Sequence, residues 1–320
     1  MACTAAVAVA FGAPVFTVTK GNPMNTSAER AASPADGPSH ALRELQVRYP
    51  RLLSIAGSDS GGGAGIQADL KTFAALGCYG MTAVTALTAQ NTLGVRAIHS
   101  VPSAMLRDQI DAVIEDIGVD AVKIGMLHSV ETIRTVSAAI DRHGLRTIVL
   151  DPVMMSTSGA RLIDDDAQAV LVSELFHRST LVTPNLDEAA LLVGQPLASE
   201  ADMESAARQL LERGANAVLL KGGHLVGVTV SDLLLQRGGA PHWMRAPRIH
   251  TGNTHGTGCT LSSAIAAHLA LGAPLLQAVE LARAFVRAAL EAGATVRTGG
   301  GSGPLNHGNA PERMRLLPLR

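Results

Sequence analysis

The chain has 320 residues, 47% of them hydrophobic, so it can bury a large core, and its length fits one large α/β domain. Its 26 basic and 27 acidic residues leave a formal net charge of -1, which provides no electrostatic basis for binding nucleic acid or an anionic membrane surface. Three widely spaced cysteines without metal-ligand spacing, and no run of about 18 apolar residues that could span a membrane, favour a cytoplasmic protein that acts on small molecules.

The first 48 residues differ in composition from the rest of the chain. An apolar run opens the chain, but no basic residue precedes Lys20, which argues against an export signal. Residues 25–40 are rich in Ser, Ala, Pro and Asp, as disordered segments are, and Met24 is an alternative start. We therefore predict that residues 1–48 form a disordered extension and that residues 49–320 form a single domain.

From Arg51 onward, short apolar runs alternate with amphipathic segments, a pattern typical of βαβ units and a parallel sheet. The predicted strands are 51–59, 81–91, 120–127, 146–153, 179–185 and 216–223, followed by antiparallel edge strands at 228–239 and 242–250. The predicted helices are 65–77, 103–118, 130–144, 204–215, 258–271 and 275–292. Ligands of such a sheet bind at the carboxyl ends of the strands, where several polar and glycine-rich stretches converge.

The stretch "GSDSGGGAG", residues 57–65, lies where the first strand ends. It is not a Walker A motif, because no Lys followed by Ser or Thr comes after Gly62, and it lacks the GxGxxG spacing of dinucleotide sites. Two interpretations stay open at this point. The backbone N–H groups approach a ligand, or the segment is a tight strand-to-helix turn.

The stretch "NTHGTGCT", residues 253–260, places Gly256 and Gly258 before a helix, whose free N–H groups would attract an anion. The threonine hydroxyls at 254, 257 and 260 are possible additional donors. Cys259 falls in the first helical turn, where the helix dipole would stabilise a thiolate that acts as a base or polarising group. The alternative is a small buried cysteine that serves packing.

Two carboxylates follow predicted strands, at Asp151 in "DPVM" and at Glu188 in "TPNLDEA". Magnesium that is bound with phosphates takes one or two carboxylates plus waters, so both are candidate ligands. The alternatives are a helix N-cap role for Asp151 and a capping box between Asn185 and Glu188, which stand three residues apart.

Gln90 ends an otherwise apolar strand, and its amide offers one acceptor and two donors. This pattern complements an aminopyrimidine edge, although a strand-end cap is the alternative. Asp69, in a predicted helix, is a further acceptor or else a solvated acid. The histidines at 224, 250 and 255 show no ligand spacing and are interpreted as structural.

Taken in order, "AGSDSGGGAGIQADLKT", "TALTAQNT", "KIGML", "DPVM", "TPNLDEA", "KGGH" and "NTHGTGCTLSSAIAA" resemble the hydroxymethylpyrimidine/phosphomethylpyrimidine kinases of thiamine biosynthesis. The resemblance covers about residues 50–308. It implies a ribokinase-like three-layer α/β/α fold, a homodimer, and the use of ATP and Mg²⁺. The implied reaction phosphorylates 4-amino-5-hydroxymethyl-2-methylpyrimidine and then converts its monophosphate to the diphosphate.

The resemblance also implies roles for individual residues. Gln90 and Asp69 would bind the pyrimidine, whose ring pocket would be lined by Gly57, Met126 and Val153. The loop Gly256 to Gly258 would form an anion hole beside a catalytic Cys259. Asp151 and Glu188 would hold magnesium, and the nucleotide would contact four residues: Asn185, Lys221, Thr254 and Thr257.

Two positions can be compared with the branches of the family that the chain resembles. Ribokinase relatives usually carry Asp where this chain has Cys259, whereas the pyrimidine kinases carry Cys. Many members have Lys where Thr157 stands here. The alternative functions are a pyridoxal kinase and a pyrimidine-binding sensor without catalytic activity.

Overall fold

The computed structural model describes residues 47–156, 159, 161–164 and 166–319. The chain divides into two units, Met1–Glu44 and Leu45–Arg320, and all described residues belong to the second. Of the predicted extension 1–48, only the last two residues are described, and they form strand β1 (Val47–Arg48), which pairs with β11 (Leu317–Pro318). The position of Thr157 lies outside the described residues.

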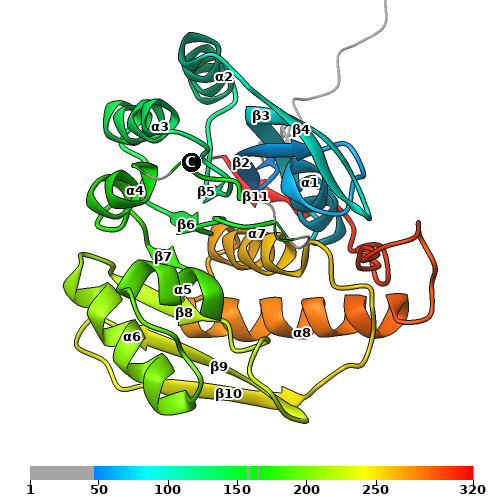
Figure 1. Cartoon of the computed structure of the whole chain (residues 1–320). Coiled ribbons are helices and arrows are strands. Elements are labelled where there is room, and N and C mark those ends of the chain that lie inside the picture. Colours follow the sequence, from blue (N-terminus) through cyan, green and yellow to red (C-terminus); the bar gives the residue numbers. More distant parts are fainter. Residues whose placement is uncertain (1–46, 157–158, 160, 165, 320) are drawn as a thin grey trace, which may run out of the picture. The chain divides into compact units, whose positions relative to one another are not determined.

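A mixed sheet of nine strands, in the order β10-β9-β8-β7-β6-β5-β2-β3-β4, runs through the described part of this unit (Figure 1). Neighbouring strands in its centre pair in parallel: β3 (Tyr79–Asn91), β2 (Arg51–Asp59), β5 (Ala121–Ile124), β6 (Ile148–Leu150), β7 (Leu181–Val182) and β8 (Ala217–Leu220). The edges are antiparallel: β4 (Gly94–Ser100) on β3, and β9 (Thr229–Gln236) with β10 (His242–Pro247) beyond β8. The mostly parallel α/β class is therefore confirmed.

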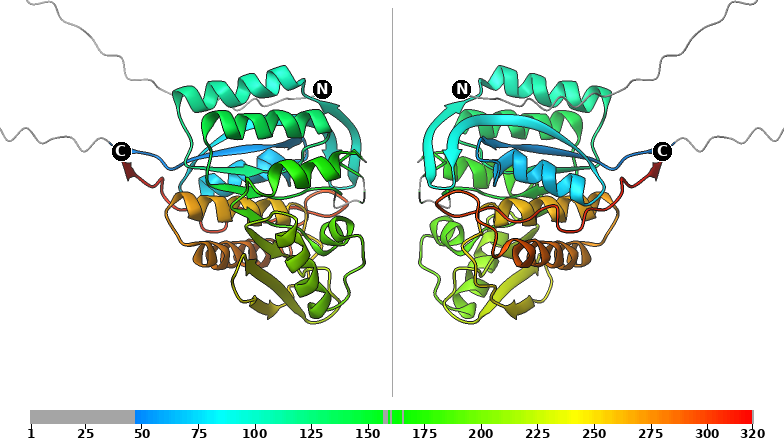
Figure 2. Two further views of the ribbon diagram at one scale, coloured as in Figure 1. Left: turned by 90° about the vertical axis from the view of Figure 1, so that its left-hand side faces the viewer. Right: turned by 90° about the vertical axis from the view of Figure 1, so that its right-hand side faces the viewer.

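Helices cover both faces of the sheet (Figure 2). One face carries α1 (Gly65–Ala75), α7 (Thr257–Ala270) and α8 (Leu275–Gly293). The other carries α2 (Ser103–Asp116), α3 (Val130–His143), α4 (Ala167–Leu175), α5 (Leu186–Val193) and α6 (Glu200–Glu212). None of these described helices combines the length and the hydropathy that a membrane crossing requires.

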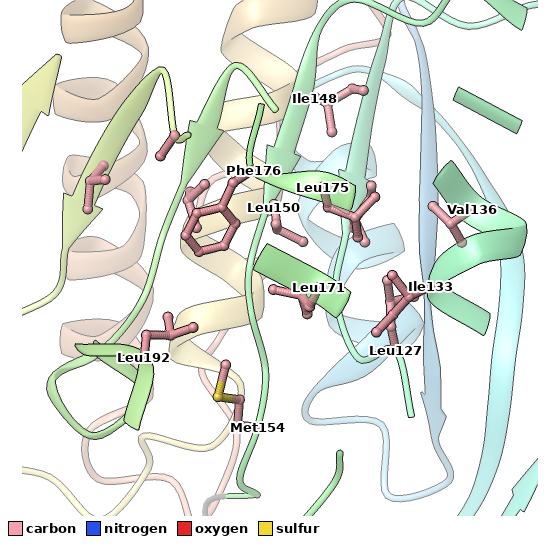
Figure 3. Packing of buried hydrophobic residues seen from close by; sticks show 14 of the residues in the cluster. Leu127, Ile133, Val136, Ile148, Leu150, Met154, Leu171, Leu175, Phe176 and Leu192 are labelled. Carbon is pink, nitrogen blue, oxygen red and sulfur yellow. The ribbon is translucent and has the colours of Figure 1, made fainter. Parts of the chain in front are cut away.

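The buried strands supply both halves of the core because successive side chains of a strand point to opposite faces. On β2, Leu52 belongs to the cluster under α1, α7 and α8, whereas Leu53 belongs to the cluster under α2 to α6. Figure 3 shows part of the second cluster, in which Leu150 of β6 packs with Leu171 of α4. This two-sided packing explains why the central strands are apolar runs without alternation.

The predicted antiparallel edge strands near residues 228–250 are confirmed, but four described elements were not predicted: β1, β4, β11 and α4. Strand β4 has a half-exposed sequence, GVRAIHS, with charged and polar side chains that mask its pattern. Strand β11 and helix α4 also had no prediction, since β11 has two residues and α4 lacks a strong polar face. Of these, β4 matters most for the site, because it forms the hairpin that carries Gln90.

Candidate active site

A lysine–aspartate pair lies at the carboxyl ends of β6 and β8, close to the start of α7. The Nζ atom of Lys221 lies 2.8 Å from Oδ1 of Asp151. A Cβ atom placed on Gly258 would lie 3.1 Å from that Nζ atom and 3.5 Å from Oδ2 of Asp151. The glycine therefore lets the first turn of α7 approach both charges closely.

The N-terminus of α7 has no side-chain cap. Gly256 is the N-cap residue, with a left-handed φ of 83° that disfavours other residues. A Cβ atom there would lie 1.9 Å from the carbonyl oxygen of Gly63, so the two glycine-rich turns are in direct contact. The N–H groups of Gly258 and Cys259 have no acceptor within the helix, as at any helix start. The predicted anion-binding loop thus has free donors.

Two threonine hydroxyls around this turn donate to backbone carbonyl oxygens of the same loop. The Thr257 hydroxyl donates to the carbonyl oxygen of Thr254 at 2.7 Å, and the Thr260 hydroxyl donates to that of Gly256 at 2.8 Å. Backbone carbonyls therefore accept these hydrogens in this arrangement, and donation by Thr257 and Thr260 to an anion stays a prediction. Thr254 is exposed, and its Oγ1 lies 3.5 Å from Oγ of Ser302, so a ligand role for Thr254 stays a prediction.

Asp151 is buried, and its carboxylate is held by several donors. Its Oδ1 accepts from Lys221 and, at 3.0 Å, from the hydroxyl of Thr183. Burial raises the pKa of Asp151, but the positive charges of Lys221 and Lys123 outweigh burial and hold that pKa below its usual range. The alternative N-cap role is wrong, because no helix begins at Asp151 and the chain continues through Pro152 without regular structure.

Glu188 and Asn185 form the predicted capping box of α5. Asn185 Oδ1 accepts from the Glu188 N–H at 2.9 Å, and Glu188 Oε2 accepts from the Asn185 N–H at 2.8 Å. The capping alternative is therefore confirmed, and a ligand role for Asn185 and Glu188 stays a prediction. The backbones of Asn185 and Lys221 form an isolated parallel β-bridge, so the capping box lies beside the charged pair.

The electrostatics around Glu188 fit a bound cation. Burial, together with the nearby charge of Asp151, raises the pKa of Glu188 to about 7 despite the opposing charge of Lys221. Within the described residues no group of three His, Cys, Asp or Glu side chains could hold a metal by itself. Two carboxylates whose repulsion a cation would relieve do suit magnesium, which completes its shell with phosphate and water oxygens. Asp151 and Glu188 therefore fit that ion.

Cys259 is half-buried in the first turn of α7. Burial raises the pKa of its thiol to about 11, and the positive charge of Lys123 offsets only part of this effect. The thiol is therefore protonated near neutral pH, which argues against the predicted thiolate, and a catalytic role for Cys259 stays a prediction. Cys78, by contrast, is buried in the core, and the choice between catalysis and packing for Cys259 stays a prediction.

Asp69 is fully buried within α1, so the alternative of a solvated helix acid is wrong. Both of its oxygens lie 2.9 Å from Nζ of Lys123 on β5. Ser54 of β2 donates to Oδ2 at 2.5 Å, and Ser263 of α7 donates to Oδ1 at 2.7 Å. No part of Asp69 is open to solvent, so the substrate contact that the resemblance implies would require these neighbours to separate.

Lys123 is a site residue that the sequence analysis missed. Its side chain is fully buried; burial lowers its pKa, but the negative charges of Asp69 and Asp151 outweigh this effect and raise the pKa of Lys123. The signal was present, because Lys123 is the one polar residue in the apolar strand sequence AVKI. A lysine at such a position indicates a buried partner, although the sequence does not say which.

The residues predicted to line a ring pocket do lie together. A Cβ atom on Gly57 would lie 3.3 Å from Sδ of Met126, and Val153 packs against the small apolar cluster that contains Met126. Gly57 lies at a β-bulge between β2 and β3. Such a bulge changes the direction in which the neighbouring side chains point. Their contact with a ligand stays a prediction.

Gln90 lies at the end of β3, directly after a second bulge, where β3 pairs with β4. Its amide contacts two side chains, with Oε1 3.1 Å from Oγ1 of Thr88 and Nε2 3.4 Å from Nε2 of His255. His255 Nε2 in turn lies 2.9 Å from Oδ2 of Asp59. These contacts agree with the structural interpretation of His255, which joins the anion loop to Asp59 and Gln90.

Asp59 organises the glycine-rich turn after β2. Its carboxylate accepts from the N–H groups of Gly61 at 2.8 Å, Gly63 at 3.1 Å and Ala64 at 2.9 Å. A Cβ atom on Gly63 would lie 2.4 Å from Cδ2 of His255, so this position has no room for a side chain. The tight-turn alternative is therefore confirmed, and the turn also packs against the anion loop.

A surface hollow lies away from this site, at the amino ends of the parallel strands. It has a volume of about 420 Å³ and is lined by residues that include Arg146 and Asn216. Arg178 in its wall is already paired with Asp141 at 2.7 Å. The hollow contains none of the predicted site residues.

The fold and the site together define a kinase of the ribokinase-like class. A phosphomethylpyrimidine kinase from Clostridium difficile superposes with a TM-score of 0.66 at 41% identity, covering 74% of this chain and 98% of that one. A pyridoxal kinase from Staphylococcus aureus, solved with ADP, has a TM-score of 0.76 at 34% identity, covering 82% and 94%.

The sequence comparisons identify the family. The phosphomethylpyrimidine kinase family model matches residues 59–306. A hydroxymethylpyrimidine/phosphomethylpyrimidine kinase from Rhizobium meliloti is 52% identical over 256 residues, which are 80% of this chain and 96% of the relative. The chain belongs to the phosphomethylpyrimidine kinase family, and the resemblance and the prediction of an enzyme are confirmed.

Some relatives are longer. A thiamine biosynthesis bifunctional protein from Geobacter sulfurreducens is 51% identical over 276 residues, and the chain spans 56% of its length. The kinase family therefore occurs both as separate chains and within larger proteins.

Proposed function

We propose that this chain uses ATP and Mg²⁺ to phosphorylate the hydroxymethyl group of 4-amino-5-hydroxymethyl-2-methylpyrimidine, and then converts the monophosphate to the diphosphate. The observation that carries the proposal is the meeting of Lys221, Asp151 and the uncapped first turn of α7 around Gly258. These groups are suited to a transferring phosphoryl group, and the family supports the acceptor.

Phosphoryl transfer passes through a loose transition state, so positioning and charge neutralisation contribute more than a strong base. The N–H groups of Gly258 and Cys259 would donate to phosphoryl oxygens, and Lys221 would exchange part of its bond with Asp151 for a phosphate contact. Magnesium, held by Asp151 and Glu188, would neutralise phosphate charge when bound. Removing one such donor from an active site typically lowers turnover by about 10²- to 10³-fold.

The acceptor alcohol would lie beside Cys259. Because the thiol is protonated, it would hydrogen-bond to the hydroxyl oxygen and orient one of its lone pairs towards the phosphorus atom. In a loose transition state the alcohol proton leaves late, when bond formation has made the oxygen acidic, and it would pass to an oxygen of the transferred phosphoryl group. A neutral thiol is therefore compatible with the reaction.

The ring would occupy the space between Gly57, Met126 and Val153, with its polar edge on Gln90. A side chain at position 57 would crowd Met126, since a Cβ atom there would lie 3.3 Å from its Sδ atom, so glycine keeps this part of the site open. The Gln90 amide would bond to the exocyclic amino group and the adjacent ring nitrogen.

A second candidate acceptor is pyridoxal. It is favoured by the higher TM-score of the Staphylococcus aureus pyridoxal kinase, 0.76 against 0.66 for the Clostridium difficile enzyme, although the sequence identities run in the opposite order. We place the aminopyrimidine first because Gln90 offers a combined donor and acceptor.

Steady-state ATP consumption with the pyrimidine alcohol, its monophosphate and pyridoxal distinguishes these proposals. We expect turnover of both pyrimidines with kcat/KM at least about tenfold above that of pyridoxal. Turnover of pyridoxal alone would replace the first candidate by the second. Binding of the pyrimidine without ATP consumption would favour the sensor.

The predicted homodimer and cytoplasmic location also stay proposals. Light scattering on the purified chain tests the first, with the mass of two chains expected. Fractionation of expressing cells tests the second.

A further inference from the structure

Three side chains from different parts of the chain meet at the pyrimidine end of the site. Asp59 comes from the end of β2, Gln90 from the end of β3, and His255 from the loop before α7. His255 is buried, and its backbone N–H donates to the carbonyl oxygen of Gly303 at 3.0 Å. The imidazole is therefore held from two sides, by its own backbone and by Asp59.

The tautomer of His255 follows from its partner. A carboxylate at neutral pH only accepts, so the Nε2 atom that lies 2.9 Å from Oδ2 of Asp59 carries a hydrogen. Although burial raises the pKa of Asp59, the hydrogen bonds from His255, Ala64 and Gly61 outweigh it and place that pKa below its usual value. His255 Nε2 is therefore a donor and has no lone pair for an NH₂ group of Gln90.

Thr88 contacts the other end of the Gln90 amide, and it also determines which amide atom can face it. Its hydroxyl has one hydrogen, and the carbonyl oxygen of Ser58, 2.8 Å away, can only accept it. The Thr88 oxygen can then only accept from Gln90, 3.1 Å away. Both contacts become favourable when the amide is turned by half a rotation, with its nitrogen donating to Thr88 and its oxygen facing His255. The single Nε2–H of His255 is then shared between Asp59, at 2.9 Å, and the Gln90 amide oxygen, at 3.4 Å.

We propose that Asp59 and His255 are positioning residues that fix this orientation of the Gln90 amide and so determine which ring edge the enzyme accepts. The proposal rests on the proposed function, in which Gln90 binds the pyrimidine. With the amide fixed, the acceptor oxygen and the donor nitrogen face the ligand in one order. In that order the amide oxygen accepts from an exocyclic amino group and the amide nitrogen donates to an unprotonated ring nitrogen. A ring edge with C=O beside N–H would place acceptor against acceptor and donor against donor.

The matched test ligands are the 4-amino alcohol and its 4-oxo analogue, 5-hydroxymethyl-2-methylpyrimidin-4-one. They have nearly the same shape, but their hydrogen-bond order is reversed. We expect the wild-type enzyme to prefer the amino compound in kcat/KM by at least about 10²-fold, since a mismatched polar edge leaves buried groups unpaired. In His255→Leu the amide can rotate, and we expect the preference to fall at least tenfold, mainly through a higher KM for the amino compound.

Two variants distinguish a loss of Gln90 positioning from a general loss of structure. His255→Gln places an NH₂ donor near the original Nε2, and we expect it to restore most of the preference. His242→Leu is the matched control, because it removes an exposed histidine that lies 3.7 Å from Glu280 and away from the site. It should leave the preference and the turnover unchanged.

Disturbance of the anion loop alone would lower kcat for both compounds equally and leave their ratio intact. An unchanged ratio in folded His255→Leu, checked by its melting temperature, would overturn the inference while leaving the proposed function in place. Absence of turnover of the 4-amino compound by the wild type would instead refute the proposed function. If His255→Leu does not fold, His255→Asn, whose amide is too short to reach Gln90, serves in its place.

Discussion

Two lysine–aspartate pairs contact or approach α7, and they differ in their access to solvent. The side chains of Lys123 and Asp69 are both 0% exposed, whereas those of Lys221 and Asp151 are 13% and 2% exposed. The first pair joins β5, α1 and α7 through the serines bound to Asp69. The second lies beside Gly258 at the start of α7. Similar chemistry thus holds the helix in one place, whereas the second and more accessible pair lies beside its uncapped first turn.

The largest expected effect comes from the buried pair. Lys123→Met leaves Asp69 charged and without its cation, and we expect a loss of about 3–5 kcal/mol of unfolding free energy. Urea unfolding followed by circular dichroism measures this. The double variant Lys123→Met/Asp69→Leu should recover most of the loss, because no unpaired charge remains. A stable single variant would show that this pair does not hold the fold together.

The accessible pair should behave in the opposite way. Lys221→Met is expected to lower kcat about 100-fold, since it removes a cation beside the transferring phosphoryl group. It should destabilise the chain less than Lys123→Met, because Asp151 keeps its hydrogen bond from Thr183 and the nearby charge of Lys123. ATP-dependent phosphorylation of the pyrimidine alcohol measures the first effect. A large loss of stability with normal turnover per folded molecule would reverse the roles assigned to the two pairs.

Cys259 lies near both pairs, as the charges that influence its pKa indicate. We expect Cys259→Ala to lower kcat at least about tenfold with the fold intact, because the thiol orients the alcohol rather than filling the core. The matched control is Cys78→Ala, which removes a core cysteine and should lower stability but not kcat. Near-normal turnover of Cys259→Ala would assign Cys259 to packing.

The smallest expected effect concerns the acid beside the accessible pair. The pKa of Glu188 is raised to about 7 in the folded chain, so the folded state binds more protons than the unfolded state between about pH 4.5 and 7. Stability should therefore fall as the pH rises through this window. Melting temperatures from pH 5 to 7.5 measure the slope, and Glu188→Gln, which keeps the capping acceptor, should flatten it. Added Mg²⁺ with ATP analogue should reduce the slope in the wild type only.

Local features of the site could be predicted well from the sequence. The capping box of Asn185 and Glu188 and the glycine at the start of α7 depend on residues within a few positions of one another. A spacing of three residues is enough to indicate such contacts. The order of strands and helices follows for the same reason, because periodicity is local.

Contacts between distant segments could not be predicted. Asp59 and His255 are 196 residues apart, and Asp69 and Lys123 are 54 apart, and no spacing rule relates either pair. The same limitation applies to the predicted thiolate of Cys259. The helix start could be inferred from the sequence, but the burial that raises the pKa of the thiol depends on neighbouring segments.

The sequence by itself determined the α/β class, the family, the glycine turns and the residue types at the site. The tertiary structure alone decided which charges are buried, which hydroxyls are already donated to carbonyls, and that His255 lies between Asp59 and Gln90. The physical reason is that hydrogen bonding and periodicity within an element act over a few residues. Desolvation and ion pairing between elements exist only after the sheet and its helices have packed.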